Sequence, residues 1–395
     1  MDFRLTPEQE KHRQEYHAVC RELSLKAPPY PIHGEKGIFG TEHGWKYFRY
    51  CAKEFAKRGW LSLSWPAEYG GSGDRMDQVL LAEAMGYNGV PGIDPFGIGM
   101  LAPTLLAVGS EELKKEFLPS IASADVMWCE LWSEPNAGSD LASLTATAIR
   151  KGDNFVINGQ KTWTTNAHNA DWGFGIFKSD PEGKKHRNLS FILMDMKTPG
   201  ITVRPLYYMN DGHILNEVYF DDAHVPARNL VGKEHDGWAV VNVLAGFERS
   251  NMGAVAGLRR QLEEIVHYCN EKVVNGRPLS RDPIIRNRLA ELACGIEATA
   301  TLGYRIADQQ NRDEMGLMDA SAMKVFSTEL EERFAALAVD IIGPAGQVTD
   351  GRWAIMGGHW INVYQESFVG TISAGTNEIQ RNIIAWYGLG LPRMR

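Results

Sequence analysis

The feature that most constrains the fold is a change in the spacing of apolar residues, which occurs twice along the chain. In the last part, Ile285, Leu289, Leu292 and Ile296 recur every three or four positions, as on one face of a helix. The first part also has a helical pattern. Between them lie short β-rich runs separated by turn residues, a pattern typical of an antiparallel barrel or sandwich. The sequence therefore predicts an α+β fold that is mostly α.

The same change of pattern divides the 395 residues into three expected domains. Residues 1–126 form an N-terminal helical domain, which opens with a capping box in which Thr6 and Gln9 have the required spacing. Residues 127–236 form a middle antiparallel β-barrel or sandwich domain, and residues 237–395 form a C-terminal domain that resembles a four-helix bundle. The expected strands of the middle domain cover residues 154–158, 189–193, 201–204 and 217–220.

Composition and the chain's ends exclude several classes of protein. The net charge is −8, from 41 Lys and Arg against 49 Asp and Glu, whereas nucleic-acid binders usually carry a basic surface. No run approaches the roughly 20 apolar residues that a membrane span needs. The first ten residues contain no apolar segment of a secretory signal, so a cytoplasmic location is expected. The five cysteines are odd in number and widely spaced, so neither a disulfide framework nor a metal site is expected.

A glycine-rich stretch, Gly86–Gly99, is the one candidate for a dinucleotide-binding loop. Such a loop must follow a strand and begin a helix, and no strand is predicted before Gly86. The stretch is therefore interpreted as a loop between helices.

Two segments carry much more specific information. The first is Ser133-Glu-Pro-Asn-Ala-Gly-Ser-Asp140, followed by Asn158-Gly-Gln-Lys-Thr-Trp-Thr-Thr-Asn166. The second is Ile372-Ser-Ala-Gly-Thr-Asn-Glu-Ile-Gln-Arg381. Together they resemble the acyl-CoA dehydrogenase family, and the resemblance covers nearly the whole chain in the order helical, β, helical.

The resemblance implies an enzyme with bound FAD that converts an acyl-CoA to its trans-2-enoyl-CoA. In this family a carboxylate removes the α-proton, and the β-hydrogen leaves as a hydride to flavin N5. Electrons then normally pass to an electron-transfer flavoprotein. The FAD is expected between the β domain and the C-terminal bundle.

The resemblance also assigns residues to the cofactor and the substrate. Ser133 and the neighbouring backbone match the strand that binds the pyrimidine edge of the flavin, Trp163 matches the aromatic beside the ring, and Thr165 matches the hydroxyl near N5. Ser139 matches a position near the thioester. The full set of cofactor residues expected in this way is Leu131, Trp132, Ser133, Trp163, Thr164, Thr165, Gly375, Thr376 and Glu378.

The catalytic base requires a second comparison within the family. Many members carry Glu directly before the C-terminal Gly-Thr, but this chain carries Ala374, which cannot accept a proton. Members of the isovaleryl and long-chain type use a Glu on a helix that opens the C-terminal domain. Glu248 matches that position and Arg249 matches the Arg that follows it, next to the substrate. The backbone N–H of Ala374 would still bind the thioester oxygen. A competing interpretation is that Glu248 only pairs with Arg249 or Arg259 on a helix surface.

Four departures from the family pattern point to a partner chain. In homotetrameric members a neighbouring subunit holds the distal part of FAD, and the matching positions here are Lys272, Asn275, Pro283 and Asp340. All four differ from the family residues. The hypothesis is an α2β2 heterotetramer with a second acyl-CoA dehydrogenase-like chain, similar to the steroid side-chain dehydrogenases of bacterial sterol or bile-acid catabolism. The alternative is a homotetramer.

Three other functions share this fold and remain open at the level of sequence. They are an acyl-CoA oxidase, a flavin monooxygenase and a non-catalytic partner subunit. Glu248 together with the flavin residues favours the dehydrogenase, with a bulky or steroid side-chain CoA ester as its substrate.

Overall fold

The computed structural model describes residues 4–28, 34–72, 74–248, 253–312, 314 and 316–393, with the backbone alone at 247, 248, 253, 254 and 317. These residues form two compact units. The first unit combines Met1–Ile38, Ser72–Pro91 and Arg249–Arg395, and the second combines Phe39–Gly71 and Gly92–Glu248. Each unit is therefore built from segments that are distant in the sequence.

The second unit contains a sheet whose strands follow the order β6-β7-β3-β2-β4-β5-β8, with β1 paired to β4. The pairs are antiparallel except for β1 with β4 and β2 with β4, which are parallel. The path ends at β6 and β8, so the sheet is open rather than a closed barrel. The strands are β1 (Trp128–Leu131), β2 (Thr147–Lys151), β3 (Asn154–Lys161), β4 (Trp172–Lys178), β5 (Leu189–Asp195), β6 (Ile201–Tyr207), β7 (His213–Pro226) and β8 (Leu230–Val231).

Alternation along the strands builds the core of this sheet. Phe155 and Ile157 of β3 and Val218 and Phe220 of β7 point to one side and are buried in a single apolar cluster. Successive side chains of a strand point to opposite faces, so residues two apart share a face. The β3–β7 register shifts between Ile157 and Gly159, which marks a β-bulge just before the second half of the first motif.

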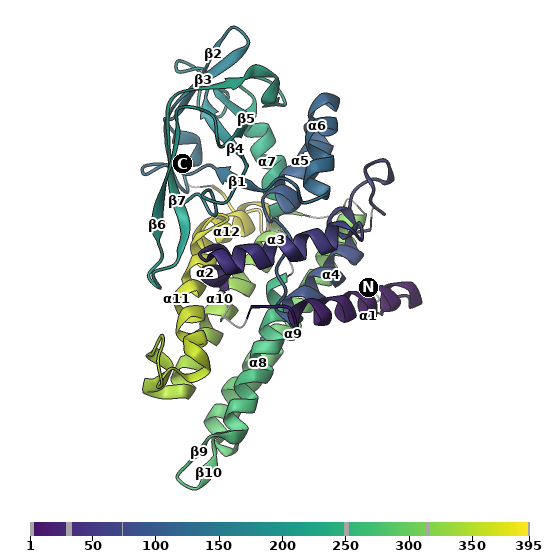
Figure 1. The fold of residues 1–395 in the computed structure, drawn as a ribbon, viewed down its shortest axis with the longest axis vertical. Helices are drawn as coiled ribbons and strands as arrows, with labels where there is room; N and C mark the ends of the chain where they lie inside the picture. The colour runs from purple at the N-terminus through teal and green to yellow at the C-terminus, as the bar shows by residue number, and fades with distance from the viewer. Residues whose placement is uncertain are drawn as a thin grey trace. The chain divides into compact units, whose positions relative to one another are not determined.

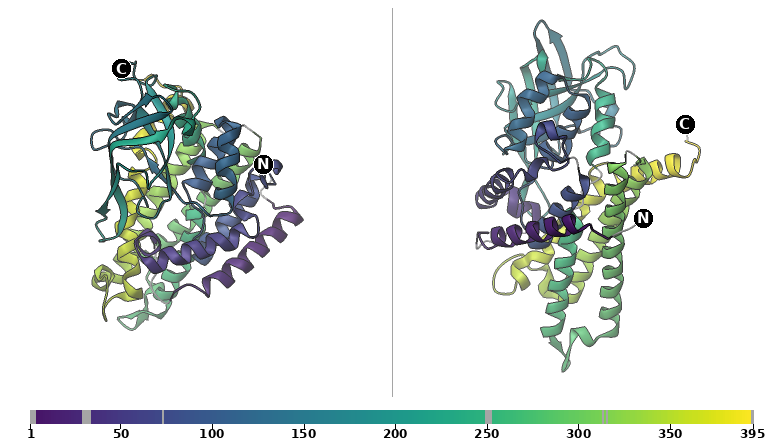
Figure 2. Two further views of the ribbon diagram at one scale, coloured as in Figure 1. Left: turned by 45° about the horizontal axis from the view of Figure 1, so that its top comes forward. Right: turned by 90° about the vertical axis from the view of Figure 1, so that its right-hand side faces the viewer.

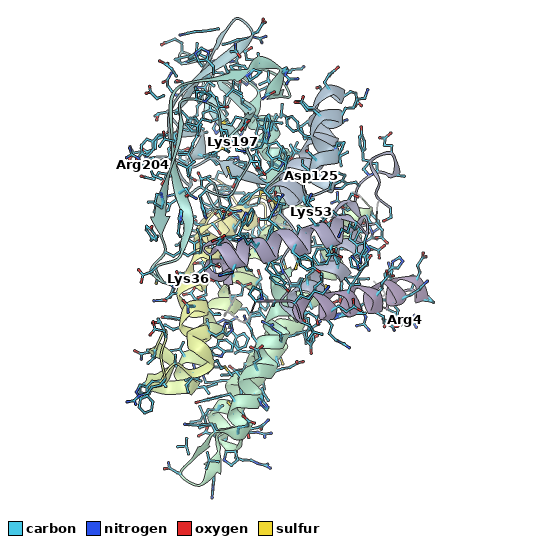
Figure 3. All side chains as sticks on the ribbon, viewed as in Figure 1. Arg4, Lys36, Lys53, Asp125, Lys197 and Arg204 are labelled. Carbon is cyan, nitrogen blue, oxygen red and sulfur yellow. The ribbon has the colours of Figure 1, made fainter. Side chains whose placement is uncertain are left out.

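Helices cover this sheet within the second unit. The helices are α3 (Glu42–Ala56), α5 (Ala102–Val108), α6 (Glu111–Ala122) and α7 (Gly237–Glu248), with short turns at Trp60–Ser62, Ala67–Tyr69, Gly97–Leu101, Leu141–Ser143 and Ala227–Asn229. Helix α7 packs against β4, β5 and α5 (Figure 1). The Lys53 ammonium of α3 contacts the Asp125 carboxylate and donates to the Ser123 carbonyl at 2.9 Å, which ties α3 to the end of α6 (Figure 3).

The first unit is a bundle of long helices with a small β-hairpin. Helix α10 lies beside α9, α11 and α12, and α4 packs on α1, α8 and α9 (Figures 1 and 2). Its elements are α1 (Pro7–Ser24), α4 (Arg75–Asn88), α8 (Gly253–Glu271), β9 (Val273–Val274), β10 (Arg277–Pro278), α9 (Pro283–Asn311), α10 (Leu317–Ile342), α11 (His359–Ile372) and α12 (Asn377–Ile383), with short turns at Leu279–Arg281, Gly343–Gln347, Ile355–Gly358 and Ile384–Gly388. Helix α2 (Gly34–Phe39) ends where the second unit begins.

Local signals in the sequence account for these helices. Thr6 caps α1 and Gln9 closes the predicted capping box. Asp282 caps α9 by accepting from Ile284 N at 2.8 Å, and Pro283 occupies its first position. The three- and four-residue spacing then places Leu289, Leu292 and Ile296 of α9 in one buried cluster with residues of α8 and α10.

The predicted fold class is confirmed: helices flank a β-rich middle segment in chain order. All four predicted strands occur, within β3, β5, β6 and β7. Strands β1, β2 and β4 were not predicted. Residues 172–178 have no alternation of apolar and polar residues, because β4 is buried on both faces. The division at residues 126 and 236 stays a prediction. Within the described residues, no helix is long and apolar enough to cross a membrane.

The stretch Gly86–Gly99 is a loop only in its middle part. Helix α4 continues to Asn88, and a π-helical turn begins at Gly97. Gly89 ends α4 in the left-handed conformation, with a φ of 62°. Glycine reaches this conformation without strain, which is the usual way to end a helix. The stretch therefore joins helices, as interpreted, over fewer residues than the sequence indicated.

Candidate active site

The first motif segment continues from β1 and lies beside the end of β3. Ser133 accepts a backbone hydrogen bond from Thr162 N at 2.8 Å, and Trp132 accepts one from the Lys161 ammonium at 2.9 Å. Leu131, the last residue of β1, pairs with Gly175 of β4. The structure thus places residues 131–133 beside residues 161 and 162, which directly precede the segment 163–165 that the sequence assigned to the same cofactor.

A buried ion pair holds the backbone of residues 131–133 in place. Lys161 and Glu134 are 0% and 5% exposed, and their charged groups lie 3.0 Å apart. Glu134 also accepts from Thr145 N at 2.7 Å and from Ala146 N at 2.9 Å. Burial lowers the pKa of Lys161 to about 8, against the opposing effect of the Glu134 charge. Burial raises the pKa of Glu134, but Lys161 and the two backbone N–H groups outweigh it and lower the value. The pair is therefore ionised at neutral pH.

The turn that contains Trp163 leaves the ring of this residue exposed. Trp163 has a φ of 60° and is 61% exposed, which is unusual for a bulky side chain. Thr164 beside it is held on both sides by Asn216 of β7, whose carbonyl accepts from Thr164 N at 3.0 Å and whose Nδ2 donates to the Thr164 carbonyl at 3.0 Å. Asn216 is fully buried. The Trp163 ring is thus presented on a rigid turn.

Two polar atoms in these segments fit a bound cofactor. The indole N–H of Trp132 and the hydroxyl of Thr164 are buried and have no hydrogen-bond partner among the described residues. Buried polar groups nearly always have a partner, so such orphaned atoms indicate a ligand or water. An exposed aromatic face next to unsatisfied donors suits a flat ring with polar edges, as in the flavin of FAD. These residues therefore fit the cofactor that the resemblance implies.

The predicted substrate residue Ser139 lies on an exposed turn of the same motif. Its neighbour Asp140 accepts from the Lys185 ammonium at 2.7 Å and from the Ser143 hydroxyl at 2.6 Å. The hydrogen bond from Lys185, followed by that from Ser143, lowers the pKa of Asp140. This turn is accessible at the surface of the second unit, as a thioester contact requires.

The second motif forms the connection between α11 and α12 in the first unit. Helix α11 ends with the bond from Ser373 N to the Val369 carbonyl at 2.9 Å. Ala374 and Gly375 then adopt left-handed conformations, with φ values of 54° and 77°. Thr376 caps α12 by accepting from Ile379 N at 3.3 Å. The structure thus places Ala374, Gly375 and Thr376 in one short connection.

Glu378 lies exposed in the first turn of α12. The hydrogen bond from its own backbone N–H, followed by that of Thr376, lowers its pKa. A carboxylate at the start of a helix is also stabilised by the helix dipole. Glu378 is therefore ionised and accessible to a polar group of a cofactor.

The predicted base and its neighbour are described only in part. Glu248 is the last residue of α7, and its side chain lies outside the description. Arg249 lies outside the described residues. The competing ion pair with Arg259 is weakened, because the guanidinium of Arg259 already binds Glu83 at 2.5 Å and Glu297 at 2.8 Å.

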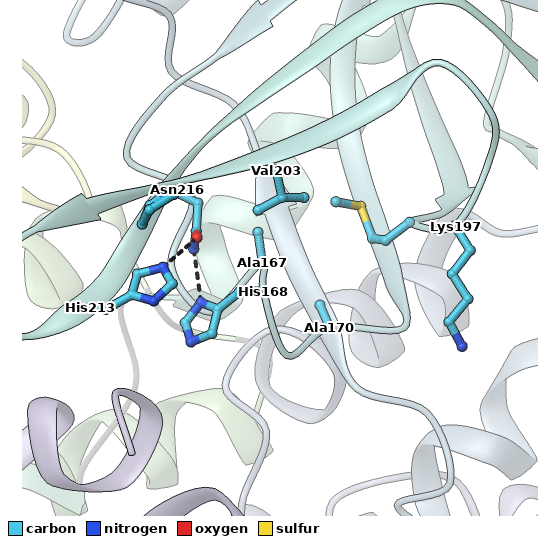
Figure 4. Close-up of a pocket in the computed structure, with 9 residues that line it drawn as sticks. Ala167, His168, Ala170, Lys197, Val203, His213 and Asn216 are labelled. Atoms are coloured by element: carbon cyan, nitrogen blue, oxygen red, sulfur yellow. Dashed lines mark hydrogen bonds between the residues drawn. The ribbon is translucent and has the colours of Figure 1, made fainter. Parts of the chain in front are cut away.

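A cavity of about 350 Å³ lies in the second unit, next to the turn that presents Trp163 (Figure 4). The rings of His168 and His213 stack there with centroids 4.0 Å apart. Both contact Asn216: His213 Nε2 lies 2.9 Å from its Oδ1, and His168 Nδ1 lies 3.2 Å from its Nδ2. Burial lowers the pKa of His168. The cavity was not predicted. Asn216, which lines it, also binds Thr164 of the segment 163–165.

Sequence reasoning missed the residues that support the two motifs. Lys161 lies inside the first motif. The signal that could have identified it was a charged residue at a core-facing position of strand β3. Asn216 and Lys324 gave no signal, because each supports a segment that is 52 or 51 residues away. Gln380 lies inside the second motif, but the sequence analysis assigned it no role.

Comparisons with known proteins agree with this geometry. Family models match in chain order: the N-terminal domain of acyl-CoA dehydrogenase over residues 6–125, the middle domain over 129–223 and the C-terminal domain over 235–387. "Acyl-CoA dehydrogenase FadE26" of Mycobacterium tuberculosis (strain ATCC 25618 / H37Rv) is 32% identical over 402 residues, covering 100% of this chain and 99% of its own length.

Two solved structures are similar over their whole length. The Tcur3481-Tcur3483 steroid ACAD has a TM-score of 0.88 at 30% identity, and the ChsE4-ChsE5 complex from Mycobacterium tuberculosis has a TM-score of 0.88 at 32% identity. Each comparison covers 100% of both chains.

Proposed function

The chain belongs to the acyl-CoA dehydrogenase family, an FAD-dependent group of oxidoreductases, and we propose that it desaturates a bulky acyl-CoA with Glu248 as the base. The α-proton of the thioester passes to the Glu248 carboxylate. The β-hydrogen would leave as a hydride, and a bound FAD would supply the acceptor. The two C–H bonds that break leave the trans-2 double bond of the enoyl-CoA.

The observation that carries this proposal is that the chain lacks a carboxylate at position 374 and has one at position 248 instead. Ala374 presents only a methyl group in the connection between α11 and α12. Glu248 ends α7, at the position where the isovaleryl-type members of the family carry their base. A chain that had lost the first carboxylate without gaining the second would have no base for the α-proton.

The chain's other residues hold the reactants. Leu131, Trp132, Ser133 and the segment 163–165 would hold the flavin. The second sequence motif also assigns Gly375, Thr376 and Glu378 to the cofactor. The backbone N–H of Ala374 would bind the thioester oxygen, and an N–H aimed at developing negative charge stabilises an enolate without a side chain. Ser139 and Arg249 would contact the substrate.

The substrate class and the partner are supported by the similar proteins. One is a steroid ACAD and another is the ChsE4-ChsE5 complex. We therefore propose a CoA ester with a bulky or steroid side chain, an α2β2 assembly with a second acyl-CoA dehydrogenase-like chain, and an electron-transfer flavoprotein as the acceptor.

Local structure at three of the four departing positions supports the heteromer over a homotetramer. Asn275 and Gly276 form the turn of the β9–β10 hairpin with φ values of 52° and 77°, which is what an Asn-Gly hairpin turn requires. Pro283 begins α9, and Asp340 accepts from Arg288 at 3.3 Å. These residues serve the chain's own fold rather than the distal end of a cofactor.

Glu248→Gln tests the assignment of the base. In the holoenzyme, purified with its partner, turnover of the best CoA ester should fall by about 10²–10⁴-fold, because the amide cannot accept the proton. The flavin spectrum and thioester binding should be kept. Glu271→Gln, at an exposed Glu at the end of α8, is the matched control.

Three outcomes would contradict the proposal. Unchanged turnover in Glu248→Gln would show that Glu248 is not the base. Stoichiometric hydrogen peroxide under air would favour an oxidase. Absence of flavin reduction by straight-chain, branched and steroid side-chain CoA esters under anaerobic conditions would favour a non-catalytic subunit.

A further inference from the structure

Two carbonyls of the connection between α11 and α12 are held by buried side chains. Gln380 Nε2 donates to the Ala374 carbonyl at 2.8 Å and lies 3.2 Å from the Gly375 carbonyl. The Lys324 ammonium of α10 donates to the Gly375 carbonyl at 3.0 Å. The connection is thus braced from its own helix α12 and from α10, which lies beside it (Figure 1).

The two donors are themselves fixed. Gln380 is 0% exposed, and its Oε1 accepts from the Ser321 hydroxyl at 2.7 Å, which leaves its Nε2 directed to the connection. Lys324 is 8% exposed and also donates to Asn377 Oδ1 at 2.7 Å. Burial of an ammonium group is costly unless hydrogen bonds replace its water, so these contacts determine where the Lys324 charge can lie.

The backbone that they hold would not stay in place on its own. Ala374 is a non-glycine residue in the left-handed region, a conformation that is strained for any residue with a Cβ atom. Gly375 is left-handed as well, and a Cβ there would lie 2.7 Å from Gln380 Nε2. Strained conformations persist where the surroundings over-determine them, and here the surroundings are Gln380 and Lys324.

The brace determines where the neighbouring N–H groups point. A trans peptide directs its carbonyl and its N–H in opposite directions. Holding the Ala374 carbonyl fixes the plane of the Ala374–Gly375 peptide, and the φ and ψ of Ala374 together then set the direction of the Ala374 N–H. An N–H that stabilises developing charge must be oriented before the reaction.

From these contacts we infer that Lys324 and Gln380 are positioning residues that direct the Ala374 N–H toward the thioester oxygen. The inference rests on the proposed function, in which that N–H binds the substrate. Neither side chain touches the reacting atoms. Their loss should affect the enolate-like transition state more than ground-state binding, so kcat should fall while KM changes little.

The test compares matched variants in the holoenzyme with its partner. Lys324→Met removes the donor, Lys324→Gln keeps one, and Ser321→Ala releases Gln380 without touching the connection. Thr299→Val is the control: it alters an equally buried residue of α9, whose hydroxyl binds only the Gly295 carbonyl of its own helix at 2.8 Å. Turnover is measured per bound FAD, so that loss of cofactor does not count as loss of activity.

A second readout reports the polarisation of the thioester directly. A 3-thiaacyl-CoA analogue of the best substrate cannot be desaturated, but its α-proton can be removed, and the resulting anion gives a long-wavelength charge-transfer band with the oxidised flavin. Lys324→Met should lower kcat by about 10²-fold, as loss of one oxyanion donor does, and move the appearance of this band to higher pH. Ser321→Ala and Lys324→Gln should lie between Lys324→Met and wild type.

The outcomes separate this inference from the proposed function. If Glu248→Gln turns over normally, the proposed function fails. If Glu248→Gln is inactive but Lys324→Met matches Thr299→Val in kcat per FAD and in the titration of the band, the positioning role is wrong. A rise in KM with kcat unchanged would also overturn it. Should Lys324→Met not fold, Ser321→Ala gives the same two readouts.

Discussion

At the scale of single residues, the site depends on charges that are buried without touching the substrate. Lys161 lies 3.0 Å from Glu134 and holds the Trp132 carbonyl, so it supports the flavin segment through the backbone. Its pKa, lowered to about 8, shows that burial acts against the charge. The ion pair is therefore better understood as fixing the shape of this segment than as a source of stability.

Lys161→Met should lower the free energy of unfolding by about 3–5 kcal/mol, because it leaves Glu134 buried without its counter-charge. Lys185→Met breaks the exposed pair with Asp140 and should cost about 1 kcal/mol or less. Urea unfolding of the two variants at neutral pH gives both values. A cost for Lys161→Met no greater than that for Lys185→Met would mean that Glu134 is satisfied by its backbone donors alone.

At the scale of elements, the turn between β3 and β4 is held to β7 by a network that depends on neutral His168. Asn216 Nδ2 can donate to His168 Nδ1 only while that nitrogen carries no proton. The same Asn216 fixes Thr164, the neighbour of the exposed Trp163. Protonation of His168 therefore weakens the support of the flavin segment.

The pH dependence follows from the direction of the pKa shift. Burial depresses the pKa of His168 below its ordinary 6.5, and the stacked His213 adds to this effect. The unfolded chain takes up this proton first, so the stability contributed is fully present above about pH 6.5 and is lost as the pH falls from there through the lower pKa of the folded protein.

His168→Asn, which keeps an acceptor for Asn216 but does not titrate, should lose less stability than wild type between about pH 8 and pH 5. Denaturant midpoints across this range measure the difference. His43→Asn, at an exposed position of α3, is the control. Parallel curves for wild type and His168→Asn would show that this network does not respond to protonation.

The elements also show how far sequence reasoning can go. Period and caps predicted α1, α9 and α10 and the strands β3, β5, β6 and β7, because these signals act within a few residues. Strand β4 was missed, because burial on both faces removes the alternation that marks a strand. The motifs assign residues 131–133, 163–165 and 374–376 to the site, and this assignment stays a prediction. The support Lys324 could not be predicted, since Lys324 and Gly375 are 51 residues apart and meet only in the folded bundle. Gln380 lies inside the second motif, but its contacts with the Ala374 and Gly375 carbonyls depend on the turn that the motif forms.

At the scale of the whole molecule, the main question is what holds the distal end of FAD. Asn275, Pro283 and Asp340 are each committed to a turn, a helix start or an ion pair of this chain. The flavin-ring residues of both motifs are present. A chain with a complete ring site and no distal grip should bind FAD weakly by itself.

Expressed alone, the chain should therefore purify with less than one FAD per chain, and co-expression with its acyl-CoA dehydrogenase-like partner should restore full occupancy and turnover. Flavin absorbance per chain and light scattering give occupancy and assembly together.

Asp340→Gln in the lone chain separates the alternatives. In a homotetramer with weakened contacts, removing this charge should raise FAD retention, because the amide can donate to the polar cofactor and Arg288 is released. In a heterotetramer it should leave retention unchanged. A lone chain that holds stoichiometric FAD and turns over acyl-CoA would show that no second subunit is needed.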